Sequence, residues 1–151
     1  MSAPDALRTD PDRVWFRFMR LHQRMLGQMT ARIRTLGLSI PQFDLLSTLT
    51  EREGISQSEL AERLYVTKGN VSGLVDRLVQ AGLVERRAIA GDRRSYAMHL
   101  TPEGRRLAEA GIAAQRSYVA TTLGKLPAGD LADLDRLVLA WRDLARAADA
   151  E

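Results

Sequence analysis

Cysteine is absent from the 151-residue sequence. Its absence excludes disulfide bonds, thiolate catalysis, cysteine-ligated zinc and redox sensing through a reactive thiol. Histidine is almost as scarce, since only His22 and His99 are present and they lie too far apart in the sequence to form a metal-binding motif. We therefore expect a protein that needs neither a metal ion nor another cofactor.

Long hydrophobic runs are lacking as well. No apolar stretch approaches the roughly 20 residues that a membrane-spanning helix needs. The N-terminal sequence Met-Ser-Ala-Pro-Asp provides neither the basic segment nor the apolar segment of a secretory signal. The sequence thus predicts a cytoplasmic protein without a membrane partner.

Lysine is rare, because 20 of the 22 basic residues are arginine. Hydrophobic residues make up 45% of the chain and charged residues 27%, which is typical of a globular domain. The formal net charge of +3 is by itself only a weak indication of nucleic-acid binding. The length predicts one domain, which we place at residues 10–149.

The two ends of this domain are expected to be helical. Asp10 and Pro11 provide an N-cap and a favourable first helical residue, and apolar residues follow at steps of three and four. Thr101 and Pro102 begin another helix in the same way. The expected helices span about residues 10–36, 102–122 and 128–149.

These terminal helices carry more apolar surface than a small domain can cover. The helix over 10–36 has two apolar stripes, and the helix over 128–149 has a seam at Leu131, Leu134 and Val138 that resembles a short heptad pattern. A second copy of the chain, related by a two-fold axis, would cover both. We therefore expect an obligate homodimer.

The middle of the chain predicts a helix-turn-helix unit over residues 56–79. Ser56 and Glu59 have the spacing of a capping box at the start of a short helix. A turn then leads to Thr67, which is a candidate N-cap of a longer helix that Gly82 ends. In such units the second helix enters the major groove of DNA.

After Gly82 the hydrophobic period changes from 3.6 to 2, which indicates strands. The pattern predicts a two-stranded hairpin, or wing, over residues 83–100, with the basic tip Gly91-Asp92-Arg93-Arg94. The expected fold class is therefore mainly α with a small β-hairpin: a winged helix-turn-helix domain plus a helical dimerisation region formed by the N- and C-terminal helices.

The residues at the start of the second helix suit DNA. Lys68 and Thr67 can bind phosphate, Asn70 can pair with adenine, and Ser72 is a versatile hydrogen-bonding residue. Gly69 and Gly73 allow close approach of the backbone to DNA, although close packing against another helix would also explain them. Residues 64–100 hold six basic and three acidic residues, which indicates DNA contact or, alternatively, only a solvated sheet edge.

Four blocks in this region together resemble the MarR family of bacterial transcriptional regulators. The Asp-Arg-Arg wing followed by Leu-Thr-x-x-Gly is the most specific part. The resemblance implies a winged-helix homodimer that binds short palindromic operators and is commonly released by a small aromatic or anionic ligand. The blocks are Thr67–Leu78, Gly82–Arg86, Gly91–Ser95 and Leu100–Gly104.

The resemblance also assigns residues. It places Arg77 at a position that often contacts the DNA backbone, and it places Arg93 and Arg94 at the wing tip. We expect Arg94 to enter the minor groove and Arg93 to lie nearer the phosphates, with the reverse assignment as the alternative. Asp92 is expected to cap the turn of the wing or to pair with a nearby arginine. The expected DNA-binding residues are Thr67, Lys68, Asn70, Ser72, Arg77, Arg93 and Arg94.

The same resemblance implies a ligand pocket between the first two helices and the DNA-binding lobe. Arg17 would meet an anion there. For Trp15, Met19 and Phe43, the simpler explanation is that they are ordinary core residues. The candidate pocket residues are Trp15, Arg17, Met19, His22 and Phe43.

Two other functional classes compete with a ligand-responsive repressor. An enzyme is disfavoured, because the sequence has no nucleophile elbow, dinucleotide-binding glycine motif or P-loop. A helical dimerisation or interaction module without sequence-specific DNA binding would leave the basic wing tip unexplained. The sequence does not distinguish a repressor from an activator.

Overall fold

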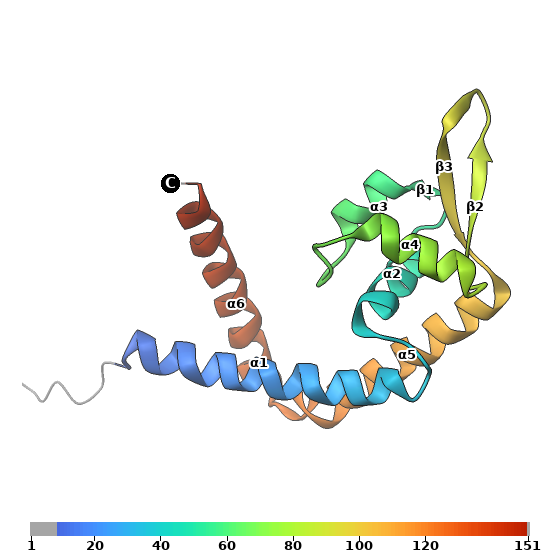
Figure 1. Cartoon of the computed structure of the whole chain (residues 1–151). Helices are drawn as coiled ribbons and strands as arrows, with labels where there is room; N and C mark the ends of the chain where they lie inside the picture. Colours follow the sequence, from blue (N-terminus) through green and yellow to red (C-terminus); the bar gives the residue numbers. More distant parts are fainter. Residues whose placement is uncertain (1–8, 151) are drawn as a thin grey trace, which may run out of the picture. The chain divides into compact units, whose positions relative to one another are not determined.

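A computed structural model describes residues 9–150 and has the expected fold class, mainly α with a small sheet (Figure 1). None of the helices in this range has the length and apolarity needed to cross a membrane. The elements, in chain order, are α1 (Pro11–Arg34), α2 (Ile40–Glu51), β1 (Ile55–Ser56), α3 (Gln57–Arg63), α4 (Val71–Gln80), β2 (Val84–Ile89), β3 (Asp92–Leu100), α5 (Pro102–Thr121), the 3-10 turn η1 (Leu123–Lys125) and α6 (Ala128–Asp149).

Local capping explains where the first three α-helices begin. The Asp10 side chain accepts a hydrogen bond from the Asp12 amide at the start of α1. Ser39 and Gln42 form a complete capping box at the start of α2. Ser56 accepts from the Glu59 amide at the start of α3. Each cap satisfies an amide that the helix itself leaves unpaired.

The helix that follows begins later than predicted. The sequence suggested Thr67 as its N-cap, but Asn70 caps α4, because its Oδ1 accepts from the Gly73 amide at 2.8 Å. Two residues with capping side chains compete here, and the Thr67 hydroxyl is buried and caps no amide. The segment between α3 and α4 is therefore a longer turn than expected.

The sheet has three antiparallel strands in the order β1-β3-β2, not the two strands of the predicted hairpin. The missed strand β1 has only two residues, which pair with Met98 and Ala97 of β3. A segment so short shows no alternating pattern in the sequence, which is why it escaped prediction. It joins the helix-turn-helix to the wing.

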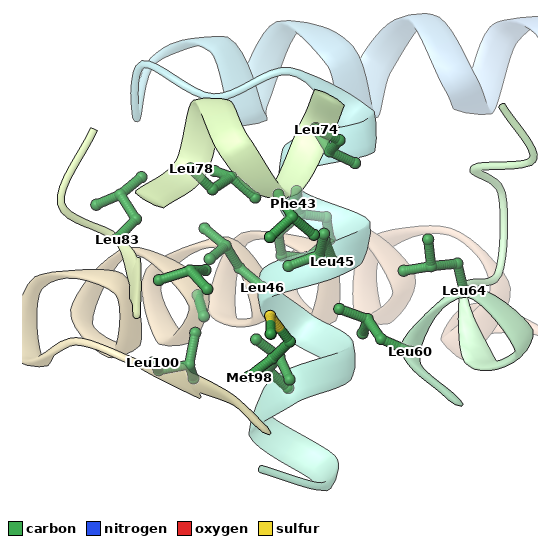
Figure 2. Close-up of a cluster of buried hydrophobic side chains, with 14 of the residues drawn as sticks. Phe43, Leu45, Leu46, Leu60, Leu64, Leu74, Leu78, Leu83, Met98 and Leu100 are labelled. Carbon is green, nitrogen blue, oxygen red and sulfur yellow. The ribbon is translucent and has the colours of Figure 1, made fainter. Parts of the chain in front are cut away.

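The chain forms two compact units, one up to Ile112 and the other from Ala113 onward. The first contains a continuous leucine-rich core with contributions from α2, α3, α4 and the sheet (Figure 2). α4 packs between α3 and β2 within this unit (Figure 1). The core thereby fixes the second helix of the helix-turn-helix beside the wing.

The second unit has no buried residue among Ala113–Ala150. Its α6 presents a long apolar surface, and α1 of the first unit also exposes large side chains, among them Trp15 and Phe16. The exposed apolar residues of α6 are Leu131, Leu134, Leu137, Val138, Leu139, Trp141 and Leu144.

Candidate nucleic-acid interface

The turn between α3 and α4 is built around a buried carboxylate, Asp44 of α2, which is 4% exposed. Its Oδ1 accepts from the Tyr65 amide at 3.0 Å, and its Oδ2 accepts from the amides of Val66 and Thr67 at 2.9 Å each. Successive amides that converge on one anion form a concave nest. Sequence reasoning missed Asp44, although an acidic residue between Phe43 and Leu45 on an apolar helix was a signal.

Thr67 lies in this turn, and its hydroxyl faces inward. The Thr67 Oγ1 is buried and makes no hydrogen bond with any residue of the described range. In this conformation the hydroxyl is therefore not presented to a phosphate, in contrast to the role expected from the sequence.

Lys68, Asn70 and Ser72 are exposed around the start of α4. The Lys68 ammonium donates to the Leu64 carbonyl at 3.2 Å. The cap occupies Asn70 Oδ1 and leaves its amide nitrogen as a donor. A Cβ at Gly73 would lie 2.5 Å from that nitrogen, so Gly73 keeps room for the Asn70 side chain.

Ion pairs divide the arginines of this region into two groups. Arg86 of β2 pairs with Asp76 and so links the wing to α4, while Arg87 pairs with Glu85 of the same strand. By contrast, Arg77, Arg93 and Arg94 are exposed and form no ion pair with any residue between 9 and 150. Their charges are available to an anionic partner.

Asp92 lies in the turn at the wing tip. Its Oδ1 accepts from the Arg94 amide at 3.0 Å, beside Gly91 with a φ of 84°. This hydrogen bond, together with one from the Ser95 side chain, lowers the pKa of Asp92. Asp92 thus acts as a turn cap, and the adjacent arginine side chains extend into solvent.

The Leu-Thr-x-x-Gly motif closes the base of the wing. The Thr101 hydroxyl donates to the Gly82 carbonyl at 2.6 Å and accepts from the Gly104 amide at 3.0 Å. A Cβ at Gly104 would lie only 1.9 Å from the carbonyl oxygen of Leu83. Glycine is therefore required where α5 crosses the start of the wing.

A second carboxylate missed by sequence reasoning, Glu53, lies between α2 and β1. One of its oxygens accepts from the Leu100 amide at 2.8 Å, and the other pairs with Arg105 of α5 at 2.7 Å. The contacts join residues 47 and 52 positions apart. No local pattern in the sequence signals such contacts.

The candidate pocket residues have different surroundings. Phe43 lies in the core, 7% exposed, and a Cβ at Gly111 would lie 2.4 Å from its ring. This placement fits the alternative interpretation of Phe43 as a core residue. Trp15, Arg17 and His22 are exposed on α1, where the His22 ring stacks with Phe18 at a centroid distance of 6.4 Å.

Several known proteins are similar to this chain in sequence. A family model described as the MarR family matches residues 36–95. The HTH-type transcriptional repressor Rv2887 of Mycobacterium tuberculosis is 32% identical over 111 residues, which cover 74% of this chain and 80% of that protein. The HTH-type transcriptional regulator PecS of Dickeya dadantii is 41% identical over 70 residues, which cover 44% of this chain and 42% of that protein.

A solved structure shows the same fold over nearly the whole chain. AbsC, a MarR family transcriptional regulator from Streptomyces coelicolor, superimposes with a TM-score of 0.79 at 22% identity. The match covers 97% of this chain and 99% of AbsC. The fold of this chain is therefore a known one.

Proposed function

The chain belongs to the MarR family of transcriptional regulators, and we propose that it acts as a homodimeric, ligand-responsive repressor that binds a palindromic DNA operator. The observation that carries the proposal is that the start of α4 and the arginine-bearing wing tip are both exposed on one compact unit, in which α4 packs against β2 of the wing. The similar protein Rv2887 is named a repressor. A repressor needs only to occupy its operator.

In this proposal α4 enters the major groove. The Asn70 amide nitrogen and the Ser72 hydroxyl face base edges, while Lys68 and Arg77 contact phosphates. The Thr67 hydroxyl is buried and does not contact a phosphate. Thr67 contributes only as part of the turn that leads into α4. Base contacts set specificity, and phosphate contacts set register and affinity.

Substituting Asn70 separates capping from base reading. Asn70→Ala is expected to lower the free energy of unfolding by about 1 kcal/mol through loss of the cap and to relax base preference at one position per half-site. Asn70→Ser retains a capping oxygen, so it is expected to keep the stability while losing about 1–3 kcal/mol of base discrimination. Denaturation curves and binding to operators with single-base changes measure the two effects.

Lys68→Ala is the matched control. It is expected to weaken binding to all sequences alike and to reduce the salt slope by about one. An Asn70→Ser protein that retains the parental base preference would show that the Asn70 amide does not read DNA.

The homodimer proposal is supported by the apolar surfaces of α1 and α6, which remain exposed in the single chain. A second copy would cover them around a two-fold axis. The axis would also present two copies of α4 at a separation of about 34–36 Å, one turn of the DNA helix. This is the geometry that a palindrome requires.

The wing is proposed to read the flanks of the operator. Arginine favours narrow, A·T-rich minor grooves, because their negative potential is high and the guanidinium group is weakly hydrated. Arg94→Ala is expected to abolish the preference for A·T-rich over G·C-rich flanks, whereas Arg93→Ala weakens binding to both. Arg87→Ala, in which the lost arginine is paired with Glu85 on the wing shaft, is the control. Parental flank preference in both tip variants would overturn this role for the wing.

A small aromatic or anionic effector is proposed to bind at α1. Arg17 would contact its negative charge, and Trp15, Met19 and His22 its apolar part. Phe43 would contribute only if the core opened, since its ring packs beside Gly111. Release of DNA would follow if the effector changed the separation of the two α4 helices.

Selection from a pool of random DNA duplexes tests the function as a whole. We expect the full-length protein to enrich an inverted repeat whose half-site centres lie about 10 base pairs apart. Enrichment of no sequence, or of an asymmetric one, would contradict the proposal.

A further inference from the structure

We propose that two carboxylates, one within α2 and one just after it, place the two DNA-reading elements: Asp44 positions α4, and Glu53 positions the wing. Both are positioning residues, because neither is presented to DNA. The inference rests on the proposed function for its DNA readout, but the contacts themselves can be tested without DNA.

Asp44 is suited to this role by burial and charge. Three consecutive amides of the turn before α4 donate to its carboxylate, at 2.9–3.0 Å. A carboxylate only accepts hydrogen bonds, so it satisfies all three donors at once. An asparagine would direct an NH₂ group at one or more of these amides. The path of residues 65–67, and with it the start of α4, therefore depends on the charge of Asp44.

Glu53 plays the corresponding part at the wing. β1 ends its pairing with β3 at Met98, where the Gly54 amide donates to the Met98 carbonyl at 2.8 Å. Beyond Met98, the next amide on the β1 side of β3 is that of Leu100. It donates to the Glu53 carboxylate. Because Arg105 pairs with the same carboxylate, Glu53 fixes the base of β3 to the start of α5.

Both carboxylates belong to the same segment of the chain, α2 and the residues just after it. Asp44 lies on α2, and Glu53 follows its last residue by two positions. Movement of this segment would be transmitted to α4 through one carboxylate and to the wing through the other. The α2 segment therefore contributes to the placement of both elements, in addition to the direct Arg86–Asp76 pair between the wing and α4.

Two isosteric substitutions, Asp44→Asn and Glu53→Gln, test the proposal in the full-length protein. Glu51→Gln is the matched control, because Glu51 also lies on α2 and accepts from the Tyr65 hydroxyl at 3.0 and 3.2 Å, but on the exposed surface. Asp44→Glu retains the charge and displaces the turn, and it replaces Asp44→Asn if the latter does not fold. The first readout is amide hydrogen exchange without DNA.

We expect exchange to accelerate at Tyr65, Val66 and Thr67 in the Asp44 variants, and at Leu100 in Glu53→Gln, with the rest of each protein unchanged. The second readout is affinity for the duplex that the parental protein selects. Asp44 variants should lose base discrimination within half-sites by about tenfold, which corresponds to about 1.4 kcal/mol, and should retain flank preference. Glu53→Gln should lose flank preference and retain base discrimination within half-sites. Glu51→Gln should match the parent in both.

Equal loss of both DNA preferences in both variants would show a merely structural role and overturn the proposal. Unchanged exchange at the named amides would overturn it as well. If exchange changes as expected but the parental protein selects no duplex, the proposed function fails while the two contacts stand as positioning contacts of the fold.

Discussion

Replacement of Gly104 by alanine is expected to lower the free energy of unfolding by about 3 kcal/mol, the upper end of the range for overpacked sites. The added Cβ would lie 1.9 Å from the Leu83 carbonyl oxygen and 2.8 Å from its carbonyl carbon. Both are backbone atoms, and the same oxygen accepts from the Thr101 amide at 3.1 Å. Relief of the clash therefore requires α5 to move away from the wing.

Gly27→Ala is the matched control for this substitution. Gly27 also lies inside a helix, but nothing lies within 4 Å of the Cβ that alanine would add. Its replacement is expected to stabilise the protein by up to about 1 kcal/mol through helix propensity. Equilibrium denaturation measures both changes, and a Gly104→Ala protein as stable as the parent would contradict the close packing.

The double substitution Leu134→Glu and Val138→Glu is expected to weaken dimerisation by about four orders of magnitude. Both side chains are exposed in the single chain. In a two-fold symmetric dimer each would be buried in both protomers, which makes four buried side chains. Four such side chains at about 1.5 kcal/mol each contribute about 6 kcal/mol, which is slightly more than four factors of ten in Kd. Operator binding should fall with dimerisation.

Sedimentation equilibrium measures the mass of each variant. Asp135→Asn is the control, because it changes an exposed polar residue of the same helix without placing a charge on the apolar surface. The parental protein and Asp135→Asn should sediment as dimers, and the double variant as a monomer. A parental protein that is a folded monomer at micromolar concentration would overturn the homodimer.

Local interactions made much of this fold predictable. Asp10, Ser39 and Ser56 cap helices through contacts with residues two or three positions away, so their patterns are visible in the sequence. The wing is predictable for the same reason, because Asp92 closes its turn through Arg94. The start of α4 was not, since Thr67 and Asn70 are both good capping residues and the buried environment of the turn decides between them.

Long-range contacts explain what the sequence did not predict about the site. Asp44 meets amides 21 to 23 positions away, and Glu53 meets an amide 47 positions away. The Thr67 amide is one of the amides that Asp44 holds. The exposed residues that we propose to face DNA could thus be selected from the sequence, whereas the residues that hold their turns in place could not.

Binding to operators with altered half-site spacing tests most directly whether two α4 helices of one dimer read the DNA together. The selected inverted repeat is compared with a duplex in which about five base pairs, half a helical turn, separate the half-sites further. The insertion places the half-sites on opposite faces of the DNA while leaving each sequence intact. We expect the affinity to fall to that for a duplex with a single half-site. Equal affinity for both spacings would mean that each α4 binds independently, in contradiction to a homodimeric reader of a palindrome.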